Sequence, residues 1–174
     1  MPSARRSPDS DARRLPREVV VQLFRRQPRE PLLMLRRVPE RGGFWQGVSG
    51  APLPGETDAD AAAREVREET GFDVTGSLFS LGIEYRHGLD PARADQWREL
   101  FGPGVRSVSV TAFAAEIPDR APVLDPAEHD RYAWCSFAAA RELLDWPIEA
   151  DARARRRAVL DRLRDRQDLF AGAE

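Results

Sequence analysis

Residues 50–72 read GAPLPGETDADAAAREVREETGF, and this stretch decides how the rest of the chain is interpreted. Thr57, with Asp60 three residues later, is a variant of the capping box that opens a helix. The alanines that follow are strong helix formers. Gly71 can adopt the left-handed conformation that ends a helix. We therefore expect a helix that starts near Asp58 and ends before Gly71.

Three glutamates follow one side of this predicted helix. Glu65, Glu68 and Glu69 stand at i, i+3 and i+4, which places the three carboxylates along one face. Close like charges destabilise a helix, and a divalent cation bound between them would reverse that cost. Hard oxygen ligands suit Mg²⁺ or Mn²⁺. The alternative is a solvated face, on which Arg64 and Glu68 make an ordinary i,i+4 ion pair.

Apolar patterning predicts the elements around this helix. Its other face is expected to pack on a sheet through Ala59, Ala62, Ala63 and Val66. Strands are predicted at 18–25, 31–37, 74–86 and 105–118, the first two forming a hairpin and the third broken by a glycine. Residues 87–104 are predicted to be a long connection with a short helix. Helices are predicted at 138–145 and 149–167, the second with Val159, Leu160 and Leu163 as its apolar stripe. The pattern predicts the α+β class, with a mixed sheet and helices.

Composition limits the classes of function. The chain has 174 residues, a hydrophobic content of 41% and a net charge of -2, which are typical of one globular domain with no bias toward nucleic acid or membranes. The single cysteine, Cys135, lies in an apolar run and is expected to be a core thiol. Arginines of the last helix alternate with aspartates, which favours a solvated face over nucleic-acid binding. With neither an apolar leader nor a membrane-length segment, we expect a cytoplasmic protein.

Domain boundaries follow from composition. Residues 1–16 are polar, rich in Arg, Ser and Pro, and are predicted to be a disordered arm. An organelle transit peptide is the alternative, against which two aspartates count. Residues 17–168 are predicted to form one domain, followed by a tail at 169–174.

The stretch 50–72 resembles the complete signature of the Nudix hydrolases, G-x5-E-x7-R-E-U-x-E-E-x-G-U, where U is apolar. The resemblance implies a mixed sheet sandwiched between helices and metal-assisted attack of water on a phosphorus of a pyrophosphate. It places Glu65, Glu68 and Glu69 in the shell of Mg²⁺ or Mn²⁺, with one of them acting on the attacking water. Arg64 is expected to pair with Glu56. Gly50 is expected to serve backbone geometry and Gly71 the turn.

A second layer of motifs is similar to the dihydroneopterin triphosphate pyrophosphatases. These motifs are FWQGVSG at 44–50, PGV at 103–105 and E-H-x-x-Y-x-W at 128–134. This resemblance implies Glu128 as an additional metal ligand, the alternative being an exposed loop acid. In Nudix folds the carbonyl before the signature glycine, here that of Ser49, also joins the metal shell. Residues 87–102 have no clear match in this group. We expect this loop to border the nucleobase or pterin and so to bear on which substrate is bound.

Three residues outside the signature are candidates for substrate binding. Arg36 and Arg37 end the second predicted strand, where they face phosphates or lie on a solvated edge. Trp45 could stack on a base or belong to the core.

The function predicted from these motifs is a pyrophosphohydrolase that cleaves a nucleoside or pterin triphosphate and releases pyrophosphate. One alternative is a dinucleoside polyphosphate hydrolase of the diadenosine tetraphosphate kind. Another is a non-catalytic domain that senses a nucleotide. The expected partner is a small-molecule nucleotide or pterin triphosphate, with neither nucleic acid nor membrane, and analogy with the family adds a homodimer.

Overall fold

The computed structural model describes residues 15–27, 29–89, 91–144 and 150–170. Most of the predicted arm (1–16) and tail (169–174), and the junction at 145–149 of the two helices predicted near the C-terminus, lie outside the described residues. The elements are β1 (Arg17–Phe24), β2 (Leu32–Arg37), η2 (Pro39–Arg41), β3 (Trp45–Gln46), β4 (Val48–Gly50), α1 (Asp58–Thr70), β5 (Leu78–Gly88), η3 (Pro91–Arg93), α2 (Ala94–Phe101), β6 (Ser107–Glu116), β7 (His129–Cys135), α3 (Phe137–Leu143) and α4 (Ala150–Arg164).

The strands of the described residues form one mixed sheet in the order β3-β2-β1-β6-β5, with β4 paired to β1 and β7 paired to β2. β1 runs parallel to β6 along its whole length. The predicted hairpin of β1 and β2 is present, with Leu23 opposite Leu33 and Phe24 opposite Leu32. Because β6, β2 and β4 all pair with β1, this strand is the centre of the sheet.

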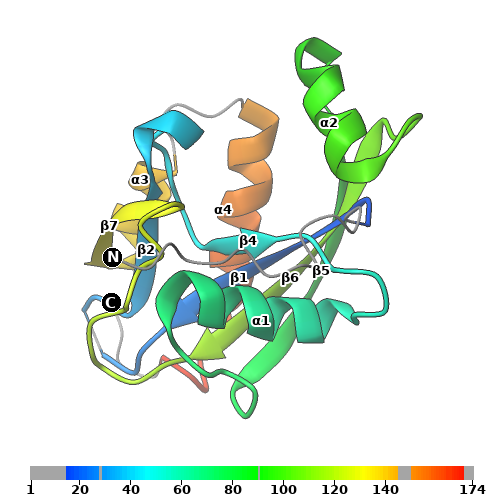
Figure 1. Cartoon of the computed structure of the whole chain (residues 1–174). Coiled ribbons are helices and arrows are strands. Elements are labelled where there is room, and N and C mark those ends of the chain that lie inside the picture. Colours follow the sequence, from blue (N-terminus) through cyan, green and yellow to red (C-terminus); the bar gives the residue numbers. More distant parts are fainter. Residues whose placement is uncertain (1–14, 28, 90, 145–149, 171–174) are drawn as a thin grey trace, which may run out of the picture.

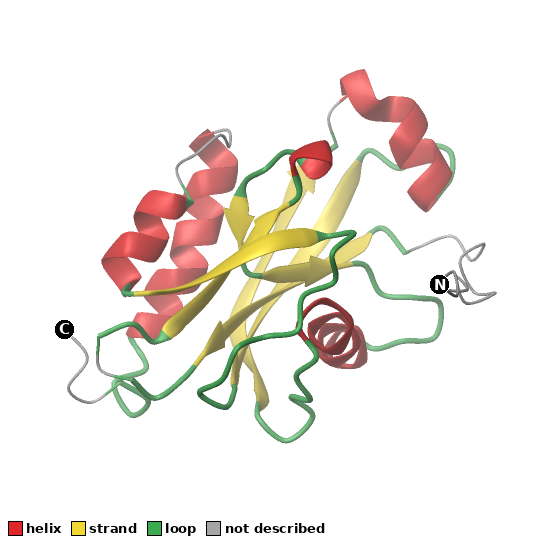
Figure 2. Ribbon diagram, turned by 60° about the vertical axis from the view of Figure 1, so that its left-hand side comes forward, coloured by secondary structure: helices red, strands yellow, loops and turns green. Residues whose placement is uncertain are grey.

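Helices cover both faces of the sheet, α1 on one side and α3 with α4 on the other (Figures 1 and 2). Alternate residues of β1 enter two separate cores, as expected for a strand buried on both sides. Val19 and Val21 pack with Val66 of α1, while Phe24 packs with residues of α3 and α4. The predicted stripe of α4 is buried: Val159, Leu160 and Leu163. The predicted sandwich is confirmed.

α1 begins and ends where the sequence predicts. The Thr57 hydroxyl accepts a hydrogen bond from the Asp60 amide at 3.1 Å, and Gly71 has a φ of 70°. The prediction of its apolar face was partly wrong, because Ala59 is exposed and Ala61 is buried instead. Glu65 and Glu69 are also buried, so the sheet-facing side of this helix carries charge.

β5 starts four residues later than predicted, because a turn occupies 75–77. The predicted glycine break is Gly82, which has a φ of 66°. Pairing with β6 shifts register between Ser80 and Ile83 at this point, as at a β-bulge. The predicted short helix in the following connection is α2, which stands at the end of the β5–β6 pair away from the main layers (Figure 1).

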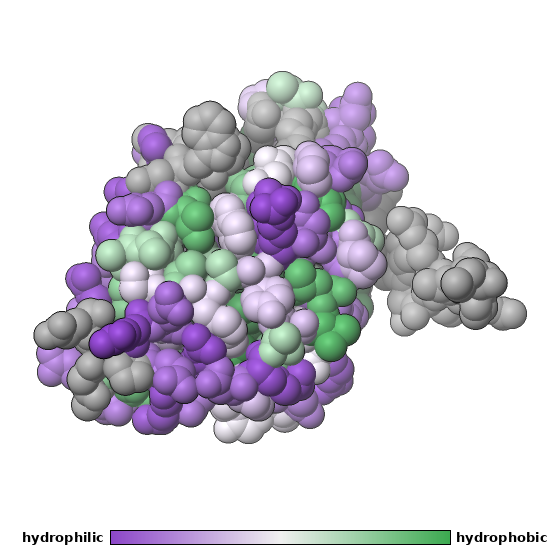
Figure 3. All heavy atoms as spheres, turned by 90° about the vertical axis from the view of Figure 1, so that its left-hand side faces the viewer, coloured by the Kyte–Doolittle hydropathy of each residue, from purple (hydrophilic) through white to green (hydrophobic). Residues whose placement is uncertain are grey.

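The described surface is mainly polar. Among the described residues, only Val123 and Tyr132 are large hydrophobic side chains with substantial exposure. The face drawn in Figure 3 shows hydrophobic residues in small separate groups among hydrophilic ones. In the part of the chain that the structure describes, no helix has the length and apolar character needed to cross a bilayer.

Candidate active site

The three signature glutamates differ in their surroundings. The whole-residue exposed fractions of Glu65 and Glu69 are 6% and 3%. The Glu68 side chain is 58% exposed and lies within hydrogen-bond distance of Arg64. All three project from the same stretch of α1 as predicted, but Glu65 and Glu69 turn toward the sheet and Glu68 turns toward solvent.

The role of Gly50 is to leave space for the Glu65 carboxyl group. A Cβ on Gly50 would overlap the Cδ and Oε1 atoms of Glu65. Gly50 does not have a positive φ. The expectation that this glycine serves backbone geometry is therefore corrected: its lack of a side chain lets a buried carboxylate approach β4.

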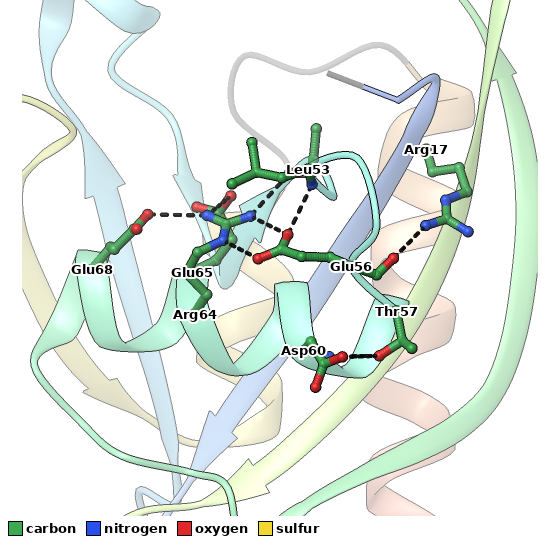
Figure 4. A network of polar contacts seen from close by, with 9 residues as sticks. Arg17, Leu53, Glu56, Thr57, Asp60, Arg64, Glu65 and Glu68 are labelled. Atoms are coloured by element: carbon green, nitrogen blue, oxygen red, sulfur yellow. Dashed lines mark hydrogen bonds and ion pairs between the residues drawn. The ribbon is translucent and has the colours of Figure 1, made fainter. Parts of the chain in front are cut away.

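Arg64 is the centre of a polar network that joins the helix to the preceding loop (Figure 4). Its Nε and Nη2 donate to the two carboxylate oxygens of Glu56 at 2.7 and 3.0 Å. Nη1 donates to Glu65 at 2.9 Å and to Glu68 at 3.1 Å. A further bond from Nη2 reaches the Ala51 carbonyl at 3.1 Å. The predicted pair of Glu56 and Arg64 is present, and so is the ordinary i,i+4 contact with Glu68.

The guanidinium of Arg64 is shared among several carboxylates. Burial lowers the pKa of Arg64, but the Glu56 hydrogen bonds and the charges of Glu65 and Glu68 raise it further, so that the guanidinium stays charged. Three carboxylates surround this one cation. A divalent metal ion bound beside them would add positive charge to this group of carboxylates.

Glu69 is held by a histidine to which the sequence pattern assigned no role. His129 Nε2 lies 2.7 Å from Glu69 Oε2, and the His129 side chain is fully buried. Burial raises the pKa of Glu69, although the hydrogen bond and charge of His129 and the charge of Arg37 oppose that rise. The available signal was the E-H-x-x-Y-x-W motif, of which only the glutamate was given a role.

The two arginines that were candidates for substrate binding form ion pairs with acidic residues of this protein. Arg37 forms an ion pair with Glu128, and Arg41 approaches the same carboxylate at 2.9 Å. Arg36 makes two hydrogen bonds to Asp130, of 2.8 and 2.5 Å. These pairs connect β2 and its following turn to the start of β7. Glu128 is therefore not a simple exposed loop acid, and its charge contributes to the raised pKa of Glu69.

The other predicted residues lie on β3, β4 and the end of α1. Ser49 is opposite Val20 of β1, and its hydroxyl lies 3.2 Å from Gln46 Nε2. Trp45 packs against the core on the α4 side, which is the core alternative. Gly71 provides the helix end. The single cysteine, Cys135, is buried, and burial followed by the charge of Glu30 raises its pKa to about 11, as expected for a core thiol.

The donor set fits a hard divalent cation. Glu65, Glu69 and Glu128 supply carboxylate oxygens, and the carbonyl of Ser49 is adjacent to the glycine against which Glu65 lies. Among the described residues, no three His, Cys, Asp or Glu side chains are already gathered into a coordination shell. Arg64, His129 and Arg37 hold these carboxylates in the structure, so a metal would exchange with or add to those contacts.

A pocket lies against β4 on the other face of the sheet. Its walls come from β1, the β3–β4 segment, β5 and α4, and include Val20, Gln22, Gln46, Tyr85, Arg156 and Leu160. Ser49 also borders it, while the next residue, Gly50, lies against Glu65. The pocket and the carboxylates therefore meet at one strand.

Comparison with known proteins agrees with this geometry. The NUDIX domain model matches residues 14–159. The chain belongs to the Nudix family. Members of this family are hydrolases of phosphoric anhydrides and generally use divalent metal ions.

Individual Nudix relatives share less than a third of their aligned residues with this chain. The dihydroneopterin triphosphate diphosphatase of Escherichia coli (strain K12) is 29% identical over 128 residues, which cover 74% of this chain and 83% of that protein. A solved structure of the E. coli dihydroneopterin triphosphate pyrophosphohydrolase has a TM-score of 0.67 and 26% identity, covering 86% of this chain and 95% of the other.

One relative is a much longer protein. The octanoyltransferase of Myxococcus xanthus is 40% identical over 119 residues, which are 68% of this chain. The chain spans only 30% of that protein's length. The activity in its name is therefore not carried over to this Nudix chain.

Proposed function

We propose that this Nudix protein is a Mg²⁺- or Mn²⁺-dependent pyrophosphohydrolase that cleaves a nucleoside or pterin triphosphate and releases pyrophosphate. The observation that carries the proposal is the pair of buried carboxylates on α1, Glu65 against Gly50 of β4 and Glu69 against His129 of β7. Burying two acids one helical turn apart is unfavourable without cations. The likeness to a dihydroneopterin triphosphate diphosphatase supports the pterin or nucleotide triphosphate as substrate.

The residues that would hold the metal are Glu65, Glu68, Glu69 and Glu128, together with the main-chain carbonyl of Ser49. When bound, such an ion supplies charge neutralisation at the phosphate oxygens and lowers the pKa of coordinated water. Glu65 and Glu69 are the most constrained of these side chains, because Gly50 and His129 limit their positions. Glu68 is open to solvent on one side of the network.

The protein's own residues would perform three tasks. A carboxylate among the three helix glutamates orients the attacking water and takes its proton. Arg64 and Glu56 keep the loop 51–57 against α1. This contact would hold the carboxylate of Glu65 in its position beside β4. Arg37 neutralises the charge of Glu128 when neither metal nor substrate is bound. Positioning and charge neutralisation are the main requirements for transfer of a phosphoryl group.

The test is hydrolysis of a panel by the purified protein with Mg²⁺ or Mn²⁺, with products identified. The panel contains dihydroneopterin triphosphate, the four dNTPs, ADP-ribose and diadenosine tetraphosphate. Release of pyrophosphate from the pterin triphosphate or a dNTP is the expected result. If the protein forms ATP from diadenosine tetraphosphate and hydrolyses no other member of the panel, the proposal is contradicted and a dinucleoside polyphosphate hydrolase is favoured. Absence of any metal-dependent turnover would favour a nucleotide-sensing domain.

A further inference from the structure

Arg156, on the wall of the pocket, has one guanidinium nitrogen without a hydrogen-bond acceptor among the described residues. Its Nη1 is buried and has no hydrogen-bond partner within the described part of the protein. Its guanidinium carbon lies 5.2 Å from the centroid of the Phe44 ring, a contact that supplies no acceptor oxygen. Burial lowers the pKa of Arg156, and the charge of Glu18 only partly opposes this. A buried N–H donor without an acceptor is unfavourable, so a ligand oxygen at this position would remove that cost.

Two glutamines place acceptor oxygens at the pocket, where Arg156 places a donor. Gln22 Nε2 donates to the main-chain carbonyls of Leu23 and Leu33 at 3.1 and 3.0 Å. Gln46 Nε2 donates to the Ser49 hydroxyl at 3.2 Å. Gln22 Nε2 donates twice and Gln46 Nε2 donates once within the protein. The side-chain carbonyl oxygens are the acceptors that these two residues can offer to a ligand. Both residues are only 4% exposed and border the pocket.

The remaining walls suit a flat, largely apolar group. Val20 and Leu160 lie on the pocket surface, and Tyr85 contributes an aromatic ring. Burial, together with the charge of Glu18, raises the pKa of Tyr85, so its phenol stays neutral near pH 7. Aromatic and aliphatic walls with a few polar groups are typical of pockets for planar organic ligands. A phosphate group would leave these apolar walls uncovered, whereas the carboxylate side of β4 already suits a metal-bound phosphate.

We infer, on the basis of the proposed function, that this pocket binds the heterocyclic ring of the substrate. Arg156 selects a ring with an oxo group, and Gln22 and Gln46 select its amino or N–H groups. The exocyclic oxygen of guanine, cytosine or a pterin would accept from Arg156. Ring N–H or amino groups would donate to the Gln22 and Gln46 oxygens. Adenine carries the amino group but has no exocyclic oxygen, so it would leave the guanidinium unpaired. Arg156 is thus a specificity-determining residue for an amino-oxo heterocycle.

The test uses phosphate-free ligands, so that it depends on neither metal nor hydrolysis. Binding of guanosine, neopterin and adenosine to the full chain is measured by calorimetry without added metal. We expect guanosine and neopterin to bind more tightly than adenosine. Arg156→Met should weaken guanosine and neopterin binding by about tenfold or more, because a hydrogen bond to a charged donor is lost. Arg162→Met, the same change at an exposed position of α4, should leave all three affinities unchanged.

Two further measurements separate recognition from stability. Arg156→Met should leave Tm unchanged or raise it, since the variant removes a buried cation whose Nη1 has no acceptor among the described residues. Arg156→Lys should retain only part of the preference for guanosine, because lysine keeps the charge but lacks the planar fork. In the hydrolysis panel, the ratio of kcat/KM for dGTP to that for dATP should fall with Arg156→Met and not with Arg162→Met.

Several outcomes would overturn the inference while leaving the proposed hydrolysis intact. One is equal binding of guanosine and adenosine by the wild-type protein. Another is a fall in Tm of Arg156→Met with unchanged nucleoside affinity, which would make Arg156 a structural residue. If Arg156→Met binds inorganic pyrophosphate more weakly but retains its nucleoside affinity, Arg156 is a phosphate ligand. Failure of hydrolysis with selective guanosine binding would instead contradict the proposed function and support the inference.

Discussion

The two faces of the central sheet treat their charged groups differently. On the α1 face, one guanidinium, that of Arg64, is surrounded by three carboxylates, and Glu69 is paired with His129. On the α4 face, the buried Nη1 of Arg156 has no acceptor among the described residues. A substrate that brings a metal-bound triphosphate would add positive charge beside the carboxylates of the first face. The oxo group of its ring would supply an acceptor for Arg156 on the second face.

The largest effect is expected from removing charge on the α1 face. Glu69→Gln keeps the shape of the side chain but removes a carboxylate from the proposed metal site. We expect kcat to fall by ~10²-fold or more, as for other groups that stabilise a transition state electrostatically. Circular dichroism should show a retained fold. The matched control is Glu142→Gln at an exposed position of α3. Retention of more than about a tenth of the activity would remove Glu69 from the metal site.

Gly50→Ala tests the close approach of β4 and α1. The added Cβ would displace the Glu65 carboxyl group, and we expect kcat to fall by about tenfold or more with a loss of ~1–3 kcal/mol in the free energy of unfolding. Gly76→Ala is the control, because a Cβ there meets no atom within 4 Å and Gly76 does not have a positive φ. Wild-type kinetics for Gly50→Ala would show that Glu65 tolerates displacement.

His129 tests whether Glu69 must be held in place. His129→Leu removes the 2.7 Å contact, and the free energy of unfolding should fall by roughly 1.5–3 kcal/mol, the range for a hydrogen bond to a charged group. Titration of Mn²⁺, followed by electron paramagnetic resonance, should show weaker binding. His129→Gln can place an N–H donor near the same carboxylate and should restore part of both quantities. If His129→Leu binds Mn²⁺ as the wild type does, His129 has no positioning role.

The smallest effect is expected near the α4 face, at the pair of His87 and Glu18. Their side-chain atoms lie 3.2 Å apart, and the hydrogen bond to Glu18 raises the pKa of His87. Because the folded-state pKa lies above the unfolded value of about 6.5, the stabilisation is fully present below that pH. It is lost as the pH rises through the folded-state pKa.

Urea unfolding at about pH 6 and about pH 8.5, for wild type and His87→Gln, measures this contribution. We expect the wild type to lose a few tenths of a kcal/mol more than the variant between the two pH values, because both side chains are partly exposed and screened by solvent. High salt should reduce the difference. Equal pH dependence of the two proteins would show that the pair contributes nothing measurable.

The parts of the fold that the sequence predicted depend on local spacing. The caps of α1, the bulge at Gly82 and the buried stripe of α4 follow from residues within a few positions of one another. The contact of Arg64 with Glu68 is local for the same reason. Such features depend on helix and strand periodicity, which is written directly in the chain.

The spacing of the signature by itself also singles out Glu56, Arg64 and the three glutamates as candidate site residues. The tertiary structure decided which carboxylates are buried, because this depends on how α1 rotates against β4. It likewise decided that Gly50 provides space and that Arg36 and Arg37 pair with acids more than ninety positions later in the chain. Residues paired across such separations depend on strand order and register, which local patterns do not specify. The same holds for Arg156, which reaches the pocket only because α4 packs across β1 and β5.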